Sequence, residues 1–404
     1  MNPTMVHSLI PKAGKHWHNR KSLVNMNILH VVNISFVIPY FLGKQMNWFV
    51  EKGNKEYIVC SPADELDEFA KRYAFEYKPI EVLRKISIGK DLKAVASTYK
   101  YIKEIKADVV TGHTPKGGLV AMLAAWMARV PIRIYLRHGL VYETSIGIKR
   151  VLLVNIDRLA SRLATKIICV SPSVARRSIE DRLNPEQKQT VLAYGTCNGI
   201  DVDRFHKDVV DLKEVRQLRE QFGISEGDFL IGFAGRLVRD KGIIELVRAY
   251  QEIHKEHKNV RLMLVGMLEI RDALPEDVIK TIKEDDGIIS TGYVSYATIE
   301  KYYALMDVYV LPSYREGFPT SVLEASAMEI PIITTRATGC CDSIVDGETG
   351  FFVEHDEREL EVALMKLYDS VALRKQMGKA GRKMVVNNFK QELVWKEIET
   401  LYFR

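Results

Sequence analysis

Cysteine and long apolar runs are both scarce in this 404-residue sequence. Its five cysteines are Cys60, Cys169, Cys197, Cys340 and Cys341, an odd number that argues against a disulfide framework. No cluster of Cys and His residues has the spacing of zinc ligands. The longest nearly uninterrupted apolar run, residues 117–128, is shorter than the roughly 20 residues that a membrane-spanning helix needs. A reducing, cytoplasmic setting is the simplest interpretation.

The first 25 residues contain no acidic residue and no long apolar segment. They carry four basic residues, Lys12, Lys15, Arg20 and Lys21, but lack the apolar core of a secretory signal. We therefore expect residues 1–25 to form a disordered leader, and the folded part of the chain to begin at Met26.

The excess of positive charge is small overall but is concentrated in one segment. The formal net charge is +6, and residues 71–106 contain ten Lys and Arg against four Asp and Glu. A solvated helix face explains such a run most simply. The alternative is a surface for an anionic membrane, to which each Lys or Arg contributes about 1 kcal/mol. Because no recognition motif accompanies the charge, we expect no nucleic-acid partner.

Short β-branched runs alternate with longer segments of helical periodicity along most of the chain. Such alternation predicts parallel sheets with helices on both faces, and the near-continuous Val and Ile content is typical of buried strands. We therefore predict an α/β fold with two Rossmann-like domains. The strand candidates are residues 27–33, 56–61, 108–113, 132–139, 166–171, 190–195, 229–236, 261–266, 308–313, 331–335 and 350–353.

The alternation is interrupted by one charged segment, which we interpret as a linker at residues 206–226. The predicted domains are then residues 26–205 and residues 227–385. The final segment, residues 386–404, has apolar residues at helical spacing. We expect it to form a helix that packs on the first domain.

Two cations follow a predicted strand in the sequence GFAGRLVRDKG, residues 232–242. Ligands of open α/β sheets bind at the carboxyl ends of strands, and Gly235 would allow close backbone approach there. The Arg236 guanidinium and the Lys241 ammonium suit the oxygens of a diphosphate. Taken alone, the segment could equally be a surface loop with incidental charges.

Two glutamates, Glu316 and Glu324, lie eight positions apart around a second predicted strand end. Glu316 falls in the loop, and residues 320–322 open the following helix, whose free N–H groups attract an anion. Glu324 lies inside that helix, where it could accept from ribose hydroxyls or simply stabilise the helix dipole. With Arg236 and Lys241, the pattern indicates a site for ribose, diphosphate and hexose, a nucleotide sugar.

Several segments resemble the retaining GT-B glycosyltransferases of family 4, which carry an E-x7-E signature. The resemblance extends from Met26 to the C-terminus and is greatest to the bacterial enzymes of capsule, O-antigen and lipid-linked glycan synthesis. The segments are GRLVRDKG (235–242), PSYREGFPTSVLEA (312–325), GCCDSIVDGETGFFV (339–353), NGIDVDRF (198–205), GHTPKGGLVA (112–121), RHGL (137–140) and ICVSPSV (168–174). One departure is the loop after the first strand, NISFVIPYFLGKQ, which has only Gly43 where many relatives have paired glycines.

The resemblance implies that the second domain holds the donor. Arg236 and Lys241 would bind the diphosphate and offset leaving-group charge. Glu316 would hold the hydroxyls of the donor sugar, Glu324 would hold the ribose, and His138 would approach the donor sugar from the first domain. Without the motif, His138 would be read as a strand-end histidine bonded to backbone. The other implied donor-binding residues are Gly235, Tyr293, Val294, Gly317, Phe318, Thr320, Ser321 and Val322.

On the acceptor side the candidates are His113 and Lys116, and Asn198 is a candidate for the interdomain hinge. The implied reaction moves a hexose or N-acetylhexosamine, with retention, from a UDP-linked donor to a hydroxyl of a polyprenyl-diphosphate-linked glycan. The enzyme would work at the cytoplasmic face of the inner membrane, in contact with anionic lipid. No DxD-type motif stands at a strand end, so we expect no metal or other cofactor.

Two other interpretations remain open from the sequence. A nucleotide-sugar epimerase shares the two-domain architecture, although its catalytic acids differ. A non-catalytic nucleotide-sugar-binding module is the other, although such a module has no need of Arg236, Lys241, Glu316 and Glu324 together. A dehydrogenase is disfavoured because no strand is followed by G-x-G-x-x-G.

Overall fold

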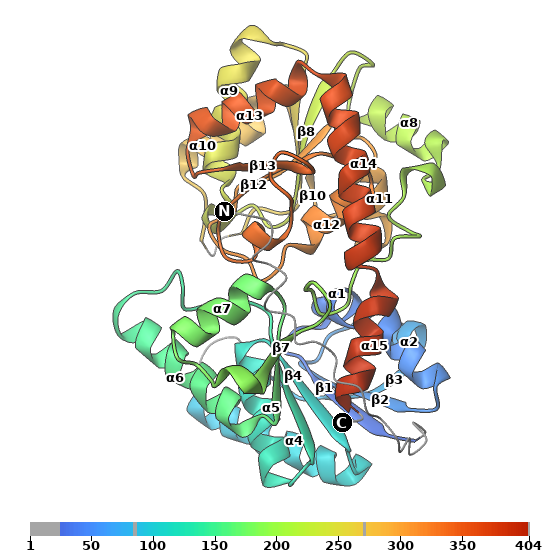
Figure 1. The fold of residues 1–404 in the computed structure, drawn as a ribbon, viewed down its shortest axis with the longest axis vertical. Coiled ribbons are helices and arrows are strands. Elements are labelled where there is room, and N and C mark those ends of the chain that lie inside the picture. The colour runs from blue at the N-terminus through green and yellow to red at the C-terminus, as the bar shows by residue number, and fades with distance from the viewer. Residues whose placement is uncertain (1–24, 84–86, 270–271, 403–404) are drawn as a thin grey trace.

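Two parallel β-sheets, one in each half of the chain, form the frame of the computed structural model (Figure 1). The structure describes residues 25–83, 87–269 and 272–402. The expected leader lies outside this part of the chain except for Asn25, as do residues 84–86 of the basic segment. Among the described residues, no helix is both long enough and apolar enough for a membrane crossing.

The first sheet has seven strands in the order β3-β2-β1-β4-β5-β6-β7, all parallel. Leu29 and Val31 of the first strand enter one apolar core while Ile28 enters another, so helices cover both faces of the sheet. Its strands are β1 (Asn27–Val31), β2 (Lys55–Cys60), β3 (Phe75–Pro79), β4 (Val109–His113), β5 (Ile132–Arg137), β6 (Lys166–Cys169) and β7 (Gln189–Val191). Its helices are α1 (Ile38–Phe41), α2 (Lys44–Glu51), α3 (Leu66–Tyr73), α4 (Ile88–Ile105), α5 (Pro115–Met127), α6 (Gly147–Leu163) and α7 (Pro172–Glu180).

The second sheet has six strands in the order β10-β9-β8-β11-β12-β13, also parallel. In both sheets the chain order reverses beside the first strand, which creates the crevice where ligands of doubly wound folds bind. The strands are β8 (Phe229–Ala234), β9 (Val260–Val265), β10 (Ile288–Gly292), β11 (Val308–Leu311), β12 (Ile332–Thr335) and β13 (Gly350–Val353). The helices are α8 (Leu212–Gln221), α9 (Ile243–Glu256), α10 (Glu276–Glu284), α11 (Ile299–Tyr303), α12 (Thr320–Ala327), α13 (Glu357–Tyr368) and α14 (Val371–Asn388).

Two strands, β3 and β10, were not among the candidates from the sequence. Both are the outermost strand on one edge of their sheet. An edge strand is buried less completely, and Glu76, Lys78 and Pro79 of β3 are indeed polar or exposed. The apolar run that marks the central strands is therefore absent from them.

Two crossing segments connect the halves and run side by side. The Ile200 N–H donates to the Phe389 carbonyl at 2.7 Å, and the Gln391 N–H donates to the Ile200 carbonyl at 3.2 Å. After the second crossing, α15 (Gln391–Tyr402) lies along the first domain near α2 (Figure 1). Its Trp395 indole donates to the Asn198 side chain at 2.9 Å, which ties both crossings together.

The segment at residues 206–226, interpreted from the sequence as a linker, contains α8. Lys301 of α11 pairs with Glu214 of α8 at 2.8 Å, and Val215 and Leu218 pack against the core of the second domain. We therefore propose that this segment is part of the second domain.

Candidate active site

The loops after β8 and β11 interlock at the carboxyl edge of the second sheet. The Tyr314 N–H donates to the Asp240 carbonyl at 2.9 Å, and Arg315 pairs with the Asp240 carboxylate at 3.1 Å. Gly242 has φ +71°, and a Cβ atom there would collide with the Pro312 carbonyl oxygen. The glycine of the sequence RDKG is therefore needed for the two loops to meet.

Interlocking brings Lys241 and Glu316 into direct contact. The Lys241 ammonium forms an ion pair with Oε1 of Glu316, and both side chains are largely buried, at 15% and 16% exposed. The two residues come from different motifs, 75 positions apart. The structure thus joins the predicted diphosphate-binding cation to the predicted sugar-binding acid.

Glu316 also lies where the two domains touch. A Cβ atom at Gly317 would collide with the carbonyl oxygen of His138, the residue that follows β5. Only glycine allows this approach, because any other residue would push the loops apart. The loop that carries Glu316 therefore contacts the backbone of His138 across the domain boundary.

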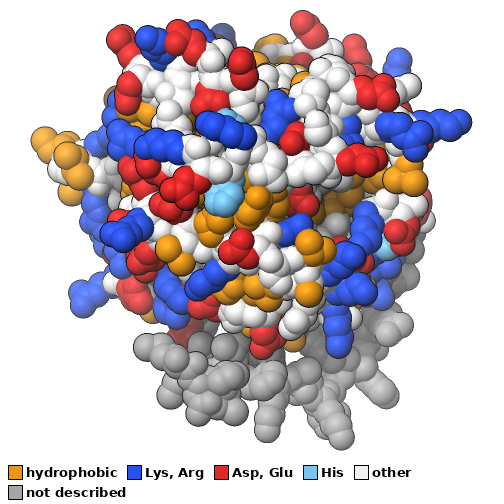
Figure 2. All heavy atoms as spheres, turned by 90° about the horizontal axis from the view of Figure 1, so that it is seen from above, with side chains coloured by type: hydrophobic (Ala, Val, Ile, Leu, Met, Phe, Trp, Pro, Cys, Tyr) orange, Lys and Arg blue, Asp and Glu red, His pale blue; other side chains and the backbone are white. Residues whose placement is uncertain are grey.

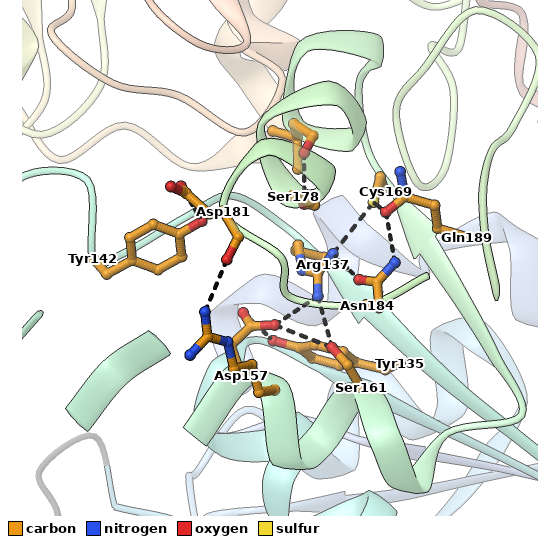
Figure 3. A network of polar contacts seen from close by, with 12 residues as sticks. Tyr135, Arg137, Tyr142, Asp157, Ser161, Cys169, Ser178, Asp181, Asn184 and Gln189 are labelled. Carbon is orange, nitrogen blue, oxygen red and sulfur yellow. Dashed lines mark hydrogen bonds and ion pairs between the residues drawn. The ribbon is translucent and has the colours of Figure 1, made fainter. Parts of the chain in front are cut away.

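A buried polar network holds the end of β5 that carries His138 (Figure 3). The fully buried Arg137 donates to Asp157 at 2.6 Å, to Ser161 at 2.7 Å and to Asn184 at 2.9 Å. Because these partners come from α6 and from the turn after α7, the network fixes β5 against both helices.

Changing Asp157 to Ala should lower the free energy of unfolding by about 3–5 kcal/mol, because it leaves the Arg137 guanidinium buried without a counter-charge. Urea denaturation measures the loss. The double change Arg137→Met with Asp157→Leu should lose less than the single change, because no charge is then left buried. The exposed change Glu226→Ala is the control. Equal stability of Asp157→Ala and the control would contradict the assignment.

Glu324 lies deeper in the second domain, where it is only 4% exposed. The Tyr303 hydroxyl donates to its carboxylate at 2.9 Å. Burial raises the pKa of Glu324 to about 7, against the opposing effects of Tyr303 and of the Arg204 guanidinium. Glu324 is thus a buried hydrogen-bond acceptor surrounded by tyrosines. It is not a solvent-exposed residue at the start of a helix.

One residue of the first domain, Tyr40, also contributes to this cluster of tyrosines. Tyr40 packs against Tyr296 with the two rings tilted and their centroids 4.2 Å apart. Burial raises the pKa of both tyrosines, and the neighbouring Glu324 raises it further. The sequence did not single out Tyr40, Tyr296, Tyr303 or Arg204. No spacing rule connects them, although NGIDVDRF includes Arg204.

Arg236 is on the same loop as Lys241 but points elsewhere. Its side chain is 47% exposed and pairs with Glu269 at 3.1 Å. At the start of α12, no side chain caps the helix, whose first residues are Thr320, Ser321 and Val322. The Val322 N–H donates to the Pro319 carbonyl at 3.1 Å, which leaves the N–H groups of Thr320 and Ser321 as the kind of site that binds phosphate.

The remaining predicted residues are spread over several environments. Tyr293 is 71% exposed, and the partly buried Val294 packs against the core. Phe318 is buried against Phe389, so its side chain serves packing. Lys116 is buried in an ion pair with Asp91 of α4.

His113 is fully buried and lies 3.1 Å behind His138, Nδ1 to Nε2. Because its side chain has no exposed surface, His113 is not positioned to contact an acceptor directly.

A cavity of about 490 Å³ opens between the domains beside Glu316. The Glu316 N–H donates to the Thr338 carbonyl at 3.0 Å, and the Thr338 hydroxyl donates to Glu143 of the first domain at 2.9 Å. None of the residues expected from the sequence lines this cavity. Its charged lining residues are Glu143, Arg150, Arg177, Arg336 and Glu354, together with His355.

Among the described residues, no three His, Cys, Asp or Glu side chains are grouped as a metal site.

Two glycosyltransferase family models match successive parts of this chain. The model of Glycosyltransferase Family 4 matches residues 46–204, and that of Glycosyl transferases group 1 matches residues 214–384. The capsular polysaccharide biosynthesis glycosyltransferase CapM of Staphylococcus aureus is 35% identical over 94% of this chain and 97% of its own length. UDP-Gal:alpha-D-GlcNAc-diphosphoundecaprenol alpha-1,3-galactosyltransferase of Escherichia coli is 26% identical over 82% of this chain and 84% of its own.

Solved structures with low sequence identity share the fold. A glycosyltransferase from Rickettsia africae superposes with a TM-score of 0.77 at 20% identity, covering 94% of this chain and 98% of its own. HepE from Anabaena, solved in complex with UDP and glucose, superposes with a TM-score of 0.76 at 18% identity. The match covers 93% of this chain and 99% of the HepE chain. The chain therefore belongs to the glycosyltransferase family in which a Family 4 domain precedes a group 1 domain, and it is a glycosyltransferase of the GT-B fold.

Proposed function

We propose that this enzyme transfers a hexose or N-acetylhexosamine from a UDP-sugar to a sugar hydroxyl of a polyprenyl-diphosphate-linked glycan, in the synthesis of a bacterial surface polysaccharide. The observation that carries the proposal is the Lys241–Glu316 pair beside His138 at the domain contact. The names of the two relatives, one of capsule synthesis and one acting on a diphosphoundecaprenol-linked sugar, support the acceptor class. The UDP complex of HepE supports the donor.

In this proposal the donor separates the Lys241–Glu316 pair by giving each residue a new partner. The diphosphate takes the Lys241 ammonium, with Arg236 and the N-terminus of α12 as further donors of positive charge. The hexose hydroxyls then donate to Glu316, and the ribose hydroxyls donate to Glu324. The base lies toward Tyr293 and Val294.

The reaction breaks the bond between the anomeric carbon and the diphosphate oxygen and forms a bond to the acceptor oxygen on the same face. The acceptor hydroxyl gives its proton to the leaving diphosphate. We nominate no carboxylate as a covalent nucleophile. Lys241 offsets the charge that develops on the leaving group, and contact between the domains excludes water.

We propose that catalysis needs no metal ion, because Lys241, Arg236 and the α12 N-terminus supply the positive charge that a metal would. The rate of sugar transfer should therefore be unchanged in excess chelator. Addition of Mg²⁺ or Mn²⁺ after chelation is the control. Loss of transfer in chelator, restored by either ion, would refute metal independence.

The acceptor side is proposed to face an anionic membrane. Arg150, Arg177 and Arg336 line the interdomain cavity, where an acceptor diphosphate would find cations. Arg150 belongs to α6, and close to it Ile146 and Ile148 are almost fully exposed, at 89% and 88%. By contrast, acidic and basic side chains intermingle on the end of the second domain (Figure 2). An apolar, basic first-domain surface fits the boundary of an anionic bilayer.

The test is sugar transfer to a synthetic polyprenyl-diphosphate-linked saccharide in vesicles of anionic or neutral lipid. A panel of nucleotide sugars is first screened by thermal stabilisation, since a ligand at 100 times its Kd adds about 2.7 kcal/mol to the stability of the protein. We expect a glycosylated lipid product with the anomeric configuration of the donor, formed faster on anionic vesicles. Interconversion of the donor sugar without transfer would indicate an epimerase. Donor binding with neither reaction would indicate a binding module.

A further inference from the structure

Four titratable side chains form a continuous row through the first sheet. Oε2 of Glu56 lies 3.1 Å from Nε2 of His30. Nδ1 of His30 lies 3.1 Å from Nε2 of His113, and Nδ1 of His113 lies 3.1 Å from Nε2 of His138. Because the residues come from β2, β1, β4 and the end of β5, which are consecutive in the sheet, each side chain stands one strand beyond the last. The row leads from the core to the domain contact.

Protein atoms enclose this row along most of its length. Glu56 and His30 are each 2% exposed. Phe41 of α1 stacks on the His138 ring with centroids 3.8 Å apart. Tyr402 of α15 lies near the inner end of the row, with its hydroxyl 3.5 Å from the Thr111 hydroxyl. Burial raises the pKa of Tyr402, and the charge of the nearby Glu56 raises it further. Only His138 has appreciable exposure.

Burial favours a row without net charge. The Glu56 carboxyl group has one polar neighbour, Nε2 of His30, and neither of its oxygens has any other hydrogen-bond partner among the described residues. Burial raises the pKa of Glu56 and lowers the pKa of His113, and it lowers the pKa of His138 to about 3. A lone carboxylate here would be an uncompensated buried charge, which favours one proton shared between Glu56 and His30.

This shared proton fixes the direction of every hydrogen bond in the row. If the proton is on Glu56, it is donated to Nε2 of His30, whose own hydrogen is then on Nδ1. If the proton is on His30, both ring nitrogens carry hydrogen. In either case Nδ1–H of His30 donates to Nε2 of His113, which must then carry its hydrogen on Nδ1. Nε2 of His138 becomes an acceptor, and the hydrogen of His138 is left on Nδ1.

We propose that Glu56 is a positioning residue that acts through His30 and His113 to hold His138 in the tautomer with hydrogen on Nδ1. The nitrogen of His138 that His113 does not engage then offers an N–H to the donor sugar. That last contact rests on the proposed function, whereas the tautomer itself does not. The buried row also keeps His138 neutral, so that it remains a directed donor rather than a cation.

The direct test is ¹⁵N NMR of the histidine rings in the full-length protein, which distinguishes a ring nitrogen that carries hydrogen from one that does not. The His138 signals are assigned by their loss in His138→Gln. We expect hydrogen on Nδ1 of His138 in the wild type, and a mixture of tautomers in Glu56→Met, which keeps the side-chain length but removes the shared proton. Tyr402→Phe, which changes the same inner region without touching the row, should keep the wild-type pattern.

Hydrogen on Nε2 of His138 in the wild type would overturn the proposal even if Glu56→Met does not fold. The wild-type pattern persisting in Glu56→Met would overturn it as well. In the transfer assay, Glu56→Met should lower kcat about tenfold, the effect of one lost hydrogen bond, with a smaller change in KM. If His138→Gln transfers sugar at the wild-type rate while the NMR pattern is as expected, the donor contact is wrong and the tautomer assignment stands.

Discussion

Glu316→Gln should lower kcat for sugar transfer by about 100- to 1,000-fold, the effect of removing one group that stabilises the transition state. The carboxylate accepts from the hydroxyls of the donor sugar and so fixes the anomeric carbon for attack. The amide is the same size but carries no charge, so Lys241 loses its ion-pair partner. The affinity for UDP, which has no hexose, should therefore stay the same or increase.

The measurement combines initial rates at saturating donor with calorimetric titration of UDP into the same preparation. Glu348→Gln is the matched control, because Glu348 is an exposed acid of the second domain in the loop between β12 and β13. A kcat within a few fold of wild type would show that Glu316 does not hold the reacting sugar. If both UDP binding and sugar transfer are lost, the change disturbs the loop around Gly317 instead.

Lys241→Met should lower kcat/KM by about 100- to 1,000-fold and should also weaken UDP binding, unlike Glu316→Gln. The reason is that the ammonium contacts the diphosphate in both the ground state and the transition state, so both binding and turnover depend on it. Removing Lys241 also leaves Glu316 largely buried without its cation, which disfavours approach of the anionic donor.

Arg236→Met provides an internal comparison on the same loop. Its guanidinium is about half exposed and pairs with Glu269, so we expect a loss of only about tenfold. Both variants are measured by transfer kinetics over a range of donor concentrations and by titration with UDP. The control is Lys280→Met, because the Lys280 side chain on α10 is exposed. A larger loss for Arg236→Met than for Lys241→Met would reverse the assignment of the main phosphate ligand.

Local pattern was sufficient to predict the elements that carry the site. Central strands such as β1 and β8 are buried on both faces and so consist mostly of apolar residues, which makes them visible in the sequence. The carboxyl ends of parallel strands all lie at one edge of the sheet. The predicted strand ends therefore place Gly235, Lys241 and Glu316 at that edge. The outer strands β3 and β10 lack this signal, since Glu76, Lys78 and Pro79 of β3 and Ser290 of β10 are exposed and neither strand forms a continuous apolar run.

Contacts between distant segments were not predictable in the same way. The sequence pairs Arg236 with Lys241 as phosphate ligands, yet the structure pairs Arg236 with Glu269, a residue 33 positions away. Likewise, His30 and Glu56 are isolated polar residues in buried strands, and only the strand order places them in one row with His113. A charged or imidazole side chain inside a Val- and Ile-rich run is the local signal that could have drawn attention to them.

A structure of the protein with an unreactive UDP-sugar analogue would show directly whether the two domains hold the sugar as proposed. We expect the diphosphate at Lys241, a hexose hydroxyl within hydrogen-bond distance of the Glu316 carboxylate, and His138 facing the same sugar from the first domain. A nucleotide bound instead to Arg150, Arg177 and Arg336, with the Lys241–Glu316 pair intact, would contradict this arrangement.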